Sequence, residues 1–307
     1  MAYIGIDVGG TNLKAGLVDE SGKILAVERT PLDFHGAEDF AATLASLARK
    51  VAGDARADYV GVGLPGAVDG GTVRFTTNIP MENVPLETLF RRHLDLPLLL
   101  GNDADCAAVG EYFGGAGRGT RDFAVVTLGT GIGVGLILNE KLRCGDASSE
   151  GGHLSVVHGG ALCNCGRRGC WERYASATAL IEQTKAAMAA HPESMLHALA
   201  EKNGGVEGRT AFEAALAGDE TALAVCRTYV EYLADGVVSL VNILRPEAVA
   251  IGGGVAAAPE ALLLEPLRRI VETESFARHG GRSTRIVRAE LGNDAGIIGA
   301  AFLGRVL

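Results

Sequence analysis

One structural layout occurs twice along this chain. A short apolar strand, a glycine-rich turn, a second strand and a polar turn follow one another at residues 3–23 and again at residues 125–141. The first turn reads Val-Gly-Gly-Thr-Asn, and the second reads Gly-Thr-Gly-Ile-Gly. Such turns join antiparallel strands and present backbone N–H groups to an anion. The repeat therefore predicts a duplicated domain, in which the two hairpins hold the phosphates of one nucleotide across a cleft.

A carboxylate stands directly before the first turn, at Asp7. It cannot bind a phosphate directly, but it can hold a hydrated magnesium ion. The alternative is a plain hairpin in which Asp7 only helps to form the turn, and the residue types do not separate the two. The second copy of the layout favours the phosphate interpretation, and no Walker A sequence competes with it.

Three of the six cysteines fall within eight positions, at Cys163, Cys165 and Cys170. Three thiolates and one imidazole suit a tetrahedral zinc site, and the nearby glycines let the backbone fold around the metal. His153 is the favoured fourth ligand and His158 is a second candidate. The alternative is a disulfide with spare thiols, but Cys163 and Cys165 are too close together to bridge comfortably, and three is an odd number.

Length and charge limit the classes of protein to consider. A chain of 307 residues is long for one hydrophobic core and predicts two domains. Its 43 glycines are about twice the usual fraction of roughly 7%, which predicts many tight turns. The formal charge of −9 argues against a nucleic-acid surface.

The chain is expected in a reducing cytoplasm. Neither a basic start nor a sustained apolar run opens the sequence, so we expect no secretory signal. The most apolar segment, residues 124–138, is broken by glycines and too short to span a bilayer. The cysteines form no paired framework, and Cys106, Cys144 and Cys226 are most simply small buried residues.

The cysteine cluster also carries a family resemblance. Glu150-Gly-Gly-His153, followed by Cys-x-Cys-Gly-x-x-Gly-Cys-x-Glu, resembles the signature of the ROK family, which groups sugar kinases with related transcriptional repressors. The resemblance implies an α/β, two-lobed actin-like ATPase (ribonuclease H-like) fold with duplicated domains and a cleft between them. It also implies that the zinc is structural and pins a loop whose Glu150, His153 and Glu172 face a sugar.

Two further stretches are ambiguous alone. Gly61-Val-Gly-Leu-Pro-Gly66 matches a dinucleotide fingerprint, but turn residues at 67–72 follow it where a helix would be needed. It resembles instead the ROK segment that borders the sugar, and Asn78 then matches a sugar-binding Asn, although alone it is more often a turn former. Asn102 and Asp103 precede an expected helix and could simply be caps. Asn-Asp-Ala resembles the ROK catalytic segment, which makes Asp103 the candidate base.

The resemblance assigns most of the candidate site. Three glycines after the strand at residues 248–251 would let an adenine ring lie against bare backbone, although a plain turn explains them equally well. The residues implied for ATP are Asp7, Gly9, Gly10, Thr11, Asn12, Lys14, Thr130, Gly131, Gly253 and Gly254. The residues implied for the substrate are Gly66, Asn78, Asn102, Asp103, Glu150, His153 and Glu172. The implied metal ligands are His153, Cys163, Cys165 and Cys170.

These observations predict an enzyme of carbohydrate metabolism. We expect ATP-dependent phosphorylation of a hexose, most simply glucose at its 6-hydroxyl, with Mg²⁺ and structural Zn²⁺, in a homodimer. An N-acetylhexosamine kinase or fructokinase would use the same residues. A sugar-sensing repressor would need a DNA-binding helix-turn-helix, and only two residues precede the first expected strand. The expected lobes are residues 1–119 with 291–307, and residues 120–290.

Overall fold

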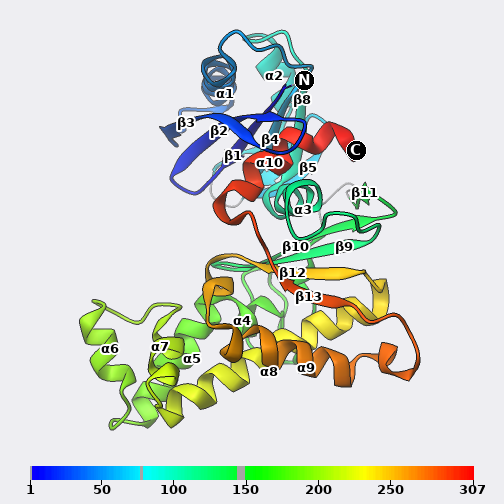
Figure 1. Ribbon diagram of the computed structural model, residues 1–307. Helices are drawn as coiled ribbons and strands as arrows, with labels where there is room; N and C mark the ends of the chain where they lie inside the picture. The colour runs from blue at the N-terminus through cyan, green and yellow to red at the C-terminus, as the bar shows by residue number, and fades with distance from the viewer. Residues whose placement is uncertain (1, 77–78, 144–148) are drawn as a thin grey trace. The chain divides into compact units, whose positions relative to one another are not determined.

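The computed structural model describes residues 2–76, 79–143 and 149–307, so Asn78 and Cys144 lie outside the described residues. The chain forms two compact units. The first unit comprises Met1–Val125, Val134–Ser149 and Ala289–Leu307, and the second comprises Val126–Gly133 and Glu150–Arg288 (Figure 1). The lobes predicted from the sequence instead place the whole second hairpin in the second lobe, whereas the two compact units share it. Those lobe boundaries remain a prediction.

The sheet of the first unit begins with a three-stranded meander that contains the first predicted hairpin. β1 (Ala2–Val8), β2 (Asn12–Asp19) and β3 (Ile24–Pro31) pair in antiparallel fashion. β4 (Val60–Leu64) and β8 (Leu98–Asn102) continue the sheet parallel to β1, in the order β3-β2-β1-β4-β8. Because β1, β4 and β8 are parallel, their carboxyl ends meet at one edge of the sheet, where ligands of open α/β sheets bind.

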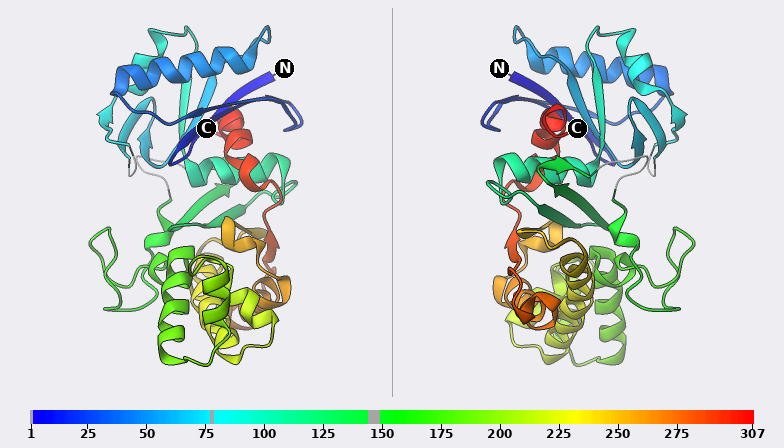
Figure 2. Two further views of the ribbon diagram at one scale, coloured as in Figure 1. Left: turned by 90° about the vertical axis from the view of Figure 1, so that its left-hand side faces the viewer. Right: turned by 90° about the vertical axis from the view of Figure 1, so that its right-hand side faces the viewer.

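Four helices complete the first unit, and they are α1 (Ala37–Ala52), α2 (Leu86–Arg91), α3 (Asp103–Gly114) and α10 (Ala295–Phe302). One face of α1 is apolar and buried, and α10 packs on α3 and β1 (Figure 2). Glycine is required where α10 crosses the meander. A Cβ at Gly5 would collide with the Ile297 carbonyl, and one at Gly16 would lie 2.5 Å from the Ile297 side chain.

The stretch after Gly66 corrects the sequence prediction of a turn over residues 67–72. A small antiparallel sheet occupies it, built from β5 (Gly66–Asp69), β6 (Thr72–Thr76) and β7 (Glu82–Val84). Only the two glycines between β5 and β6 form the turn. No helix follows the Gly-x-Gly-x-x-Gly match among these described residues, so the exclusion of a dinucleotide fingerprint stands.

The second five-stranded sheet has the order β11-β10-β9-β12-β13. β9 (Phe123–Leu128) and β10 (Ile132–Leu138) form the second predicted hairpin and contribute residues to both units. β11 (Lys141–Leu142) pairs antiparallel with β10, and β12 (Ala248–Gly252) pairs parallel with β13 (Arg285–Arg288). The α/β fold with duplicated sheets is therefore confirmed.

The helices of the second unit are α4 (Glu172–Ala175), α5 (Ala177–Ala190), α6 (Leu196–Lys202), α7 (Thr210–Leu216), α8 (Glu220–Leu244) and α9 (Leu264–Glu274). Ser176 separates α4 from α5, and its hydroxyl caps α5 by accepting from the Ala179 N–H at 3.1 Å. The described residues also form six 3-10 helices, Gly151–His153, Gly254–Ala257, Glu260–Leu262, Phe276–His279, Gly292–Asp294 and Leu303–Arg305.

Within the described ranges, every helix is too short or too polar to cross a bilayer.

Candidate active site

The first unit brings two carboxylates together at the carboxyl edge of its sheet. Asp7 lies near the end of β1, and Asp103 begins α3 directly after β8. Burial, and to a smaller extent the negative charge of Asp103, raise the pKa of Asp7 to about 6, while Lys14 acts in the opposite direction. Asp7 is therefore ionised at neutral pH but binds protons more readily than an ordinary carboxylate. This pair can hold a cation on one side and accept a proton on the other.

Lys14 connects this edge to the start of α10. It stands opposite Asp7 in the β1–β2 register, and its Nζ lies 2.6 Å from Asp294 Oδ1 and 3.2 Å from the Asn293 carbonyl oxygen. The Asp294 side chain makes no capping hydrogen bond at the start of α10 and pairs with Lys14 instead. Its position near the site could not be found from the sequence, since 280 residues separate the partners.

Asn102 is a cap, as its residue type alone suggested. Its Oδ1 accepts from the Ala104 N–H at 2.8 Å and from the Asp105 N–H at 3.4 Å. Its Nδ2 donates to the Gly66 carbonyl at 2.9 Å, which fixes β5 against the start of α3. Both polar ends of this amide therefore have partners within the protein. Asp103 Oδ1 also accepts from the Ala104 N–H, at 2.8 Å.

The first glycine-rich turn is open to solvent. Gly9, Gly10, Thr11 and Asn12 are all exposed. The Gly9 N–H donates to the Asn12 carbonyl at 2.9 Å, and Asn12 Nδ2 donates to Thr11 Oγ1 at 2.9 Å. An exposed turn of this composition can receive an anion without displacing other side chains.

The second unit assembles the predicted metal ligands. His153, Cys163, Cys165 and Cys170 place one ligand atom each within 4.8 Å of the others. Cys163 Sγ lies 3.6 Å from His153 Nδ1, and Cys165 Sγ lies 3.6 Å from Cys170 Sγ. A tetrahedral zinc ion with ordinary bond lengths would set S···N to about 3.6 Å and S···S to about 3.8 Å. The cluster therefore fits zinc, and it contains His153 rather than the exposed His158.

The two nitrogens of His153 face different partners. Nδ1 points at the thiolates, while Nε2 lies 3.9 Å from Glu150 Oε2. Glu172 Oε1 lies 3.0 Å from Cys163 Sγ and 3.8 Å from His153 Nδ1. A metal on Nδ1 would fix the tautomer with the proton on Nε2. One imidazole can thus serve the metal and also donate a hydrogen bond beside Glu150.

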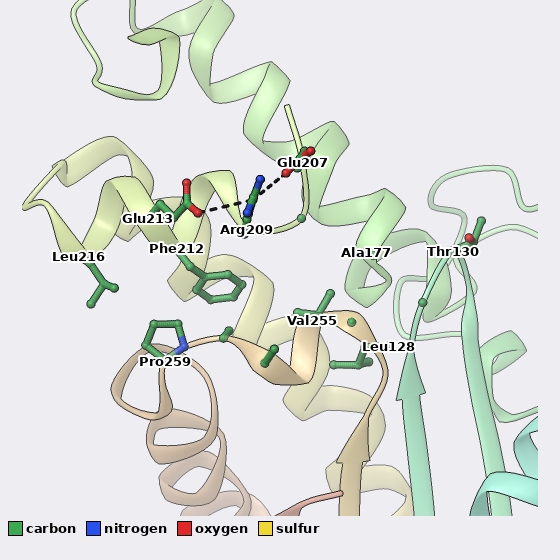
Figure 3. A pocket seen from close by; sticks show the side chains of 15 residues that line it. Leu128, Thr130, Ala177, Glu207, Arg209, Phe212, Glu213, Leu216, Val255 and Pro259 are labelled. Carbon is green, nitrogen blue, oxygen red and sulfur yellow. Dashed lines mark hydrogen bonds and ion pairs between the residues drawn. The ribbon is translucent and has the colours of Figure 1, made fainter. Parts of the chain in front are cut away.

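A cavity of about 580 Å³ adjoins the second glycine-rich turn (Figure 3). Its walls come from the turn itself at Gly129 and Thr130, from Gly254 after β12, and from Phe212 on α7. Gly253 has a φ of 81°, and a Cβ there would collide with the Leu128 backbone, so glycine is required for β9 to approach this closely. The cavity is predominantly apolar and suits a flat heteroaromatic ring.

Charged side chains stand at one end of this cavity. Arg209 Nε lies 2.7 Å from Glu207 Oε2 and 3.6 Å from Glu213 Oε1, as the dashed lines in Figure 3 mark. The sequence indicated only the turn and the triple glycine. Phe212, Val255 and Ala177 also line the cavity, and no local pattern points to them because they come from separate elements.

Comparison with known proteins agrees with the family signature. The model of the ROK family matches residues 3–306. The chain belongs to the ROK family. The resemblance stated from the cysteine cluster is therefore confirmed over nearly the whole chain.

Related ROK proteins include glucokinases. The glucokinase of Thermotoga maritima is 39% identical over 98% of this chain and 96% of its own length. The glucokinase of Streptomyces coelicolor is 36% identical over 98% of this chain and 97% of its own length. The crystal structure of a ROK family glucokinase from Streptomyces griseus, in complex with glucose and AMPPNP, is 36% identical, with a TM-score of 0.81 over 99% of both chains. The actin-like ATPase fold is thus shown for this chain.

Proposed function

We propose that this ATP-dependent hexose kinase phosphorylates glucose at its 6-hydroxyl, with Asp103 as the general base. The observation that carries the proposal is the pairing of Asp103 with Asp7 at the carboxyl edge of the first sheet, in a ROK chain whose relatives include glucokinases. Phosphoryl transfer needs an in-line acceptor hydroxyl, charge neutralisation and a carboxylate to take the proton. Asp103 supplies the last of these.

Asp7 would hold magnesium through its water shell, because its carboxylate is ionised above about pH 6. Lys14 moderates the negative charge, and Asp294 fixes Lys14. The triphosphate would bind the two turns, through Gly9, Gly10, Thr11 and Asn12 in the first and through Thr130 and Gly131 in the second. The cavity beside Gly253 and Gly254 would take the base.

Glu150, His153 and Glu172 would bind the sugar from the second unit. Together they offer two carboxylates and one imidazole N–H to a ring that both donates and accepts hydrogen bonds. Zinc would hold the loop that carries them. Gly66, Asn78 and Asn102 remain further candidates from the first unit. Asn78 lies outside the described residues, and Asn102 already uses its amide within the protein.

A coupled ADP-release assay across a hexose panel tests the proposal. We expect glucose to have the highest kcat/KM and 2-deoxyglucose to be phosphorylated measurably. N-acetylglucosamine and N-acetylmannosamine should be poor substrates, since a pocket shaped around a small hydroxyl rejects added bulk more strongly than a missing group. A preference for an acetylated sugar or for fructose would change the substrate and leave the kinase assignment. Absence of turnover with every sugar would contradict the assignment itself.

A further inference from the structure

One short segment of the second unit joins the metal cluster to the second glycine-rich turn. It begins at the metal ligand Cys170 and ends eight residues later at Thr178. The Ala177 N–H donates to the Gly129 carbonyl at 2.8 Å, and the Thr178 hydroxyl donates to the Thr130 carbonyl at 2.8 Å. Two consecutive carbonyl groups of the turn are therefore held by the first residues of α5.

These two bonds also set the direction of the turn's N–H groups. In a trans peptide the C=O of one residue and the N–H of the next point in opposite directions, and the described chain contains no cis peptide. Because the carbonyls of Gly129 and Thr130 face α5, the N–H groups of Thr130 and Gly131 point away from it. Two adjacent N–H groups with a common direction form an anion-binding nest.

Glu172 connects the same turn to the metal cluster by its side chain. Its Oε1 lies 3.0 Å from Cys163 Sγ, while its Oε2 lies 2.6 Å from the place where a Cβ at Gly131 would stand. One carboxylate therefore contacts a metal ligand with one oxygen and packs on the turn with the other. Any side chain at residue 131 would displace it.

Helix α8 anchors this segment independently of the metal. Trp171 is fully buried, and its Nε1 donates to the Tyr232 carbonyl at 2.8 Å. A Cβ at Gly236, one turn further along α8, would collide with the indole ring. The ring of Tyr232 packs on Tyr174 at 4.8 Å between centroids, and the Tyr174 hydroxyl accepts from the Ala161 N–H at 2.7 Å. Both sides of the metal loop are thus fixed to one turn of α8.

We propose that the segment from Cys170 to Thr178 is a positioning element that couples the metal loop to the donor-phosphate turn, and that Thr178 is a positioning residue for the donor. The inference rests on the proposed function, because it takes the turn at residues 129–131 as a phosphate site. An ordered metal loop then pre-organises the turn, so that loss of the metal weakens nucleotide binding even when no sugar is present. The coupling is reciprocal: bound nucleotide favours the ordered loop.

Thr178→Val removes the hydroxyl and keeps the side-chain volume. We expect it to raise the KM for ATP about three- to tenfold, as the loss of one intramolecular hydrogen bond implies. The KM for glucose and the zinc content should stay within about twofold, and Thr178→Ser should restore the ATP KM. Thr273→Val is the matched control, because Thr273 also donates to a backbone carbonyl, that of Arg269 at 2.9 Å, on an exposed part of α9.

Nucleotide binding without sugar provides the second measurement. Trp171 is the one tryptophan of the chain, so intrinsic fluorescence reports on the segment during titration with AMPPNP. Removing zinc with a chelator should weaken AMPPNP binding by the wild type several-fold, and much less in Thr178→Val, whose turn is already released. The coupling would be overturned if Thr178→Val and the wild type had the same KM for ATP. It would also be overturned if the AMPPNP affinity of the wild type were the same with and without zinc. Failure of zinc-loaded wild type to bind AMPPNP would overturn the proposed function as well.

Discussion

The two glycine-rich turns share a layout but are held in different ways. The first is exposed, and it is held by hydrogen bonds within the hairpin and by one from the Leu32 N–H to the Thr11 carbonyl. The second has its carbonyls bound by α5 and is covered at Gly131 by Glu172. The first turn lies next to the charged groups Asp7 and Lys14, whereas the second adjoins an apolar cavity.

The supporting strands of the two hairpins remain alike. Gly5 and Gly16 let the first hairpin press against α10, and Gly135 lets the second press against α3, where a Cβ would collide with the Ala104 carbonyl. Both hairpins thus share a close approach of strand and helix, and they differ in the residues that surround each turn. We infer that the charged groups needed for the reaction are concentrated at the first turn, while the second turn holds the donor phosphates in position.

The largest effect should come from changing the charged groups beside the first turn. Asp103→Asn keeps the shape of the side chain but lacks a basic oxygen, so kcat should fall about 10²- to 10⁴-fold with the KM for glucose nearly unchanged. Steady-state kinetics measure this. Asp39→Asn is the control, since Asp39 is likewise in the first turn of a helix, α1, and is exposed. A near wild-type kcat in Asp103→Asn would mean that this residue only starts a helix.

The second largest effect should come from removing the metal from the cluster that supports the second turn. Cys165→Ser changes the exposed ligand of the cluster, so it disturbs packing least. We expect metal analysis to show one zinc per wild-type chain and little in the variant, with sugar affinity lowered more than about tenfold because the loop loses its metal-dependent order. Cys226→Ala, a buried cysteine outside the cluster, should retain zinc. Active wild type without zinc would contradict the structural role of the metal.

A pH effect should probe the first turn, because it adjoins Asp7, whose pKa is raised. Activity at limiting Mg²⁺ should fall as the pH drops through about 6, where Asp7 gains a proton. Asp103→Asn should move the pKa of Asp7 downward by removing a repelling charge, which a magnesium titration at several pH values can detect. The raised pKa also affects stability, because the Asp7 carboxyl holds its proton more tightly in the folded protein than in the unfolded chain. Asp7 therefore costs stability progressively as the pH rises from about 4 to about 6. A magnesium affinity independent of pH between 5 and 7 would exclude Asp7 as the metal carboxylate.

The smallest expected effect is on the KM for glucose when one glycine of each turn is replaced by alanine. Gly131→Ala would force the flexible end of Glu172 to move, and we expect the KM for glucose to rise about threefold. In Gly9→Ala the nearest atom to the new Cβ is the Asn12 carbonyl oxygen at 3.2 Å, so the glucose KM should not change. Equal effects of the two substitutions on the glucose KM would show that Glu172 does not link the second turn to the sugar.

Local patterns were sufficient for many elements. The spacing of Phe40, Leu44, Leu47 and Val51 predicts α1, because a helix of this kind depends on neighbours three and four positions apart. The small sheet β5–β6–β7 was missed. Its strands are short, and the turn residues Asp69, Gly70 and Gly71 dominate the local signal.

The sequence by itself determined the family, the duplicated hairpins and three residues of the four-residue cluster, since each depends on residue types at short and fixed spacing. Tertiary structure decided that His153 rather than His158 completes the cluster, that Asn102 ties Gly66 to α3, and that Asp294 pairs with Lys14. These outcomes depend on which side chains a fold brings within a few ångströms. That proximity is set by the packing of elements up to 280 residues apart, and no local pattern encodes it.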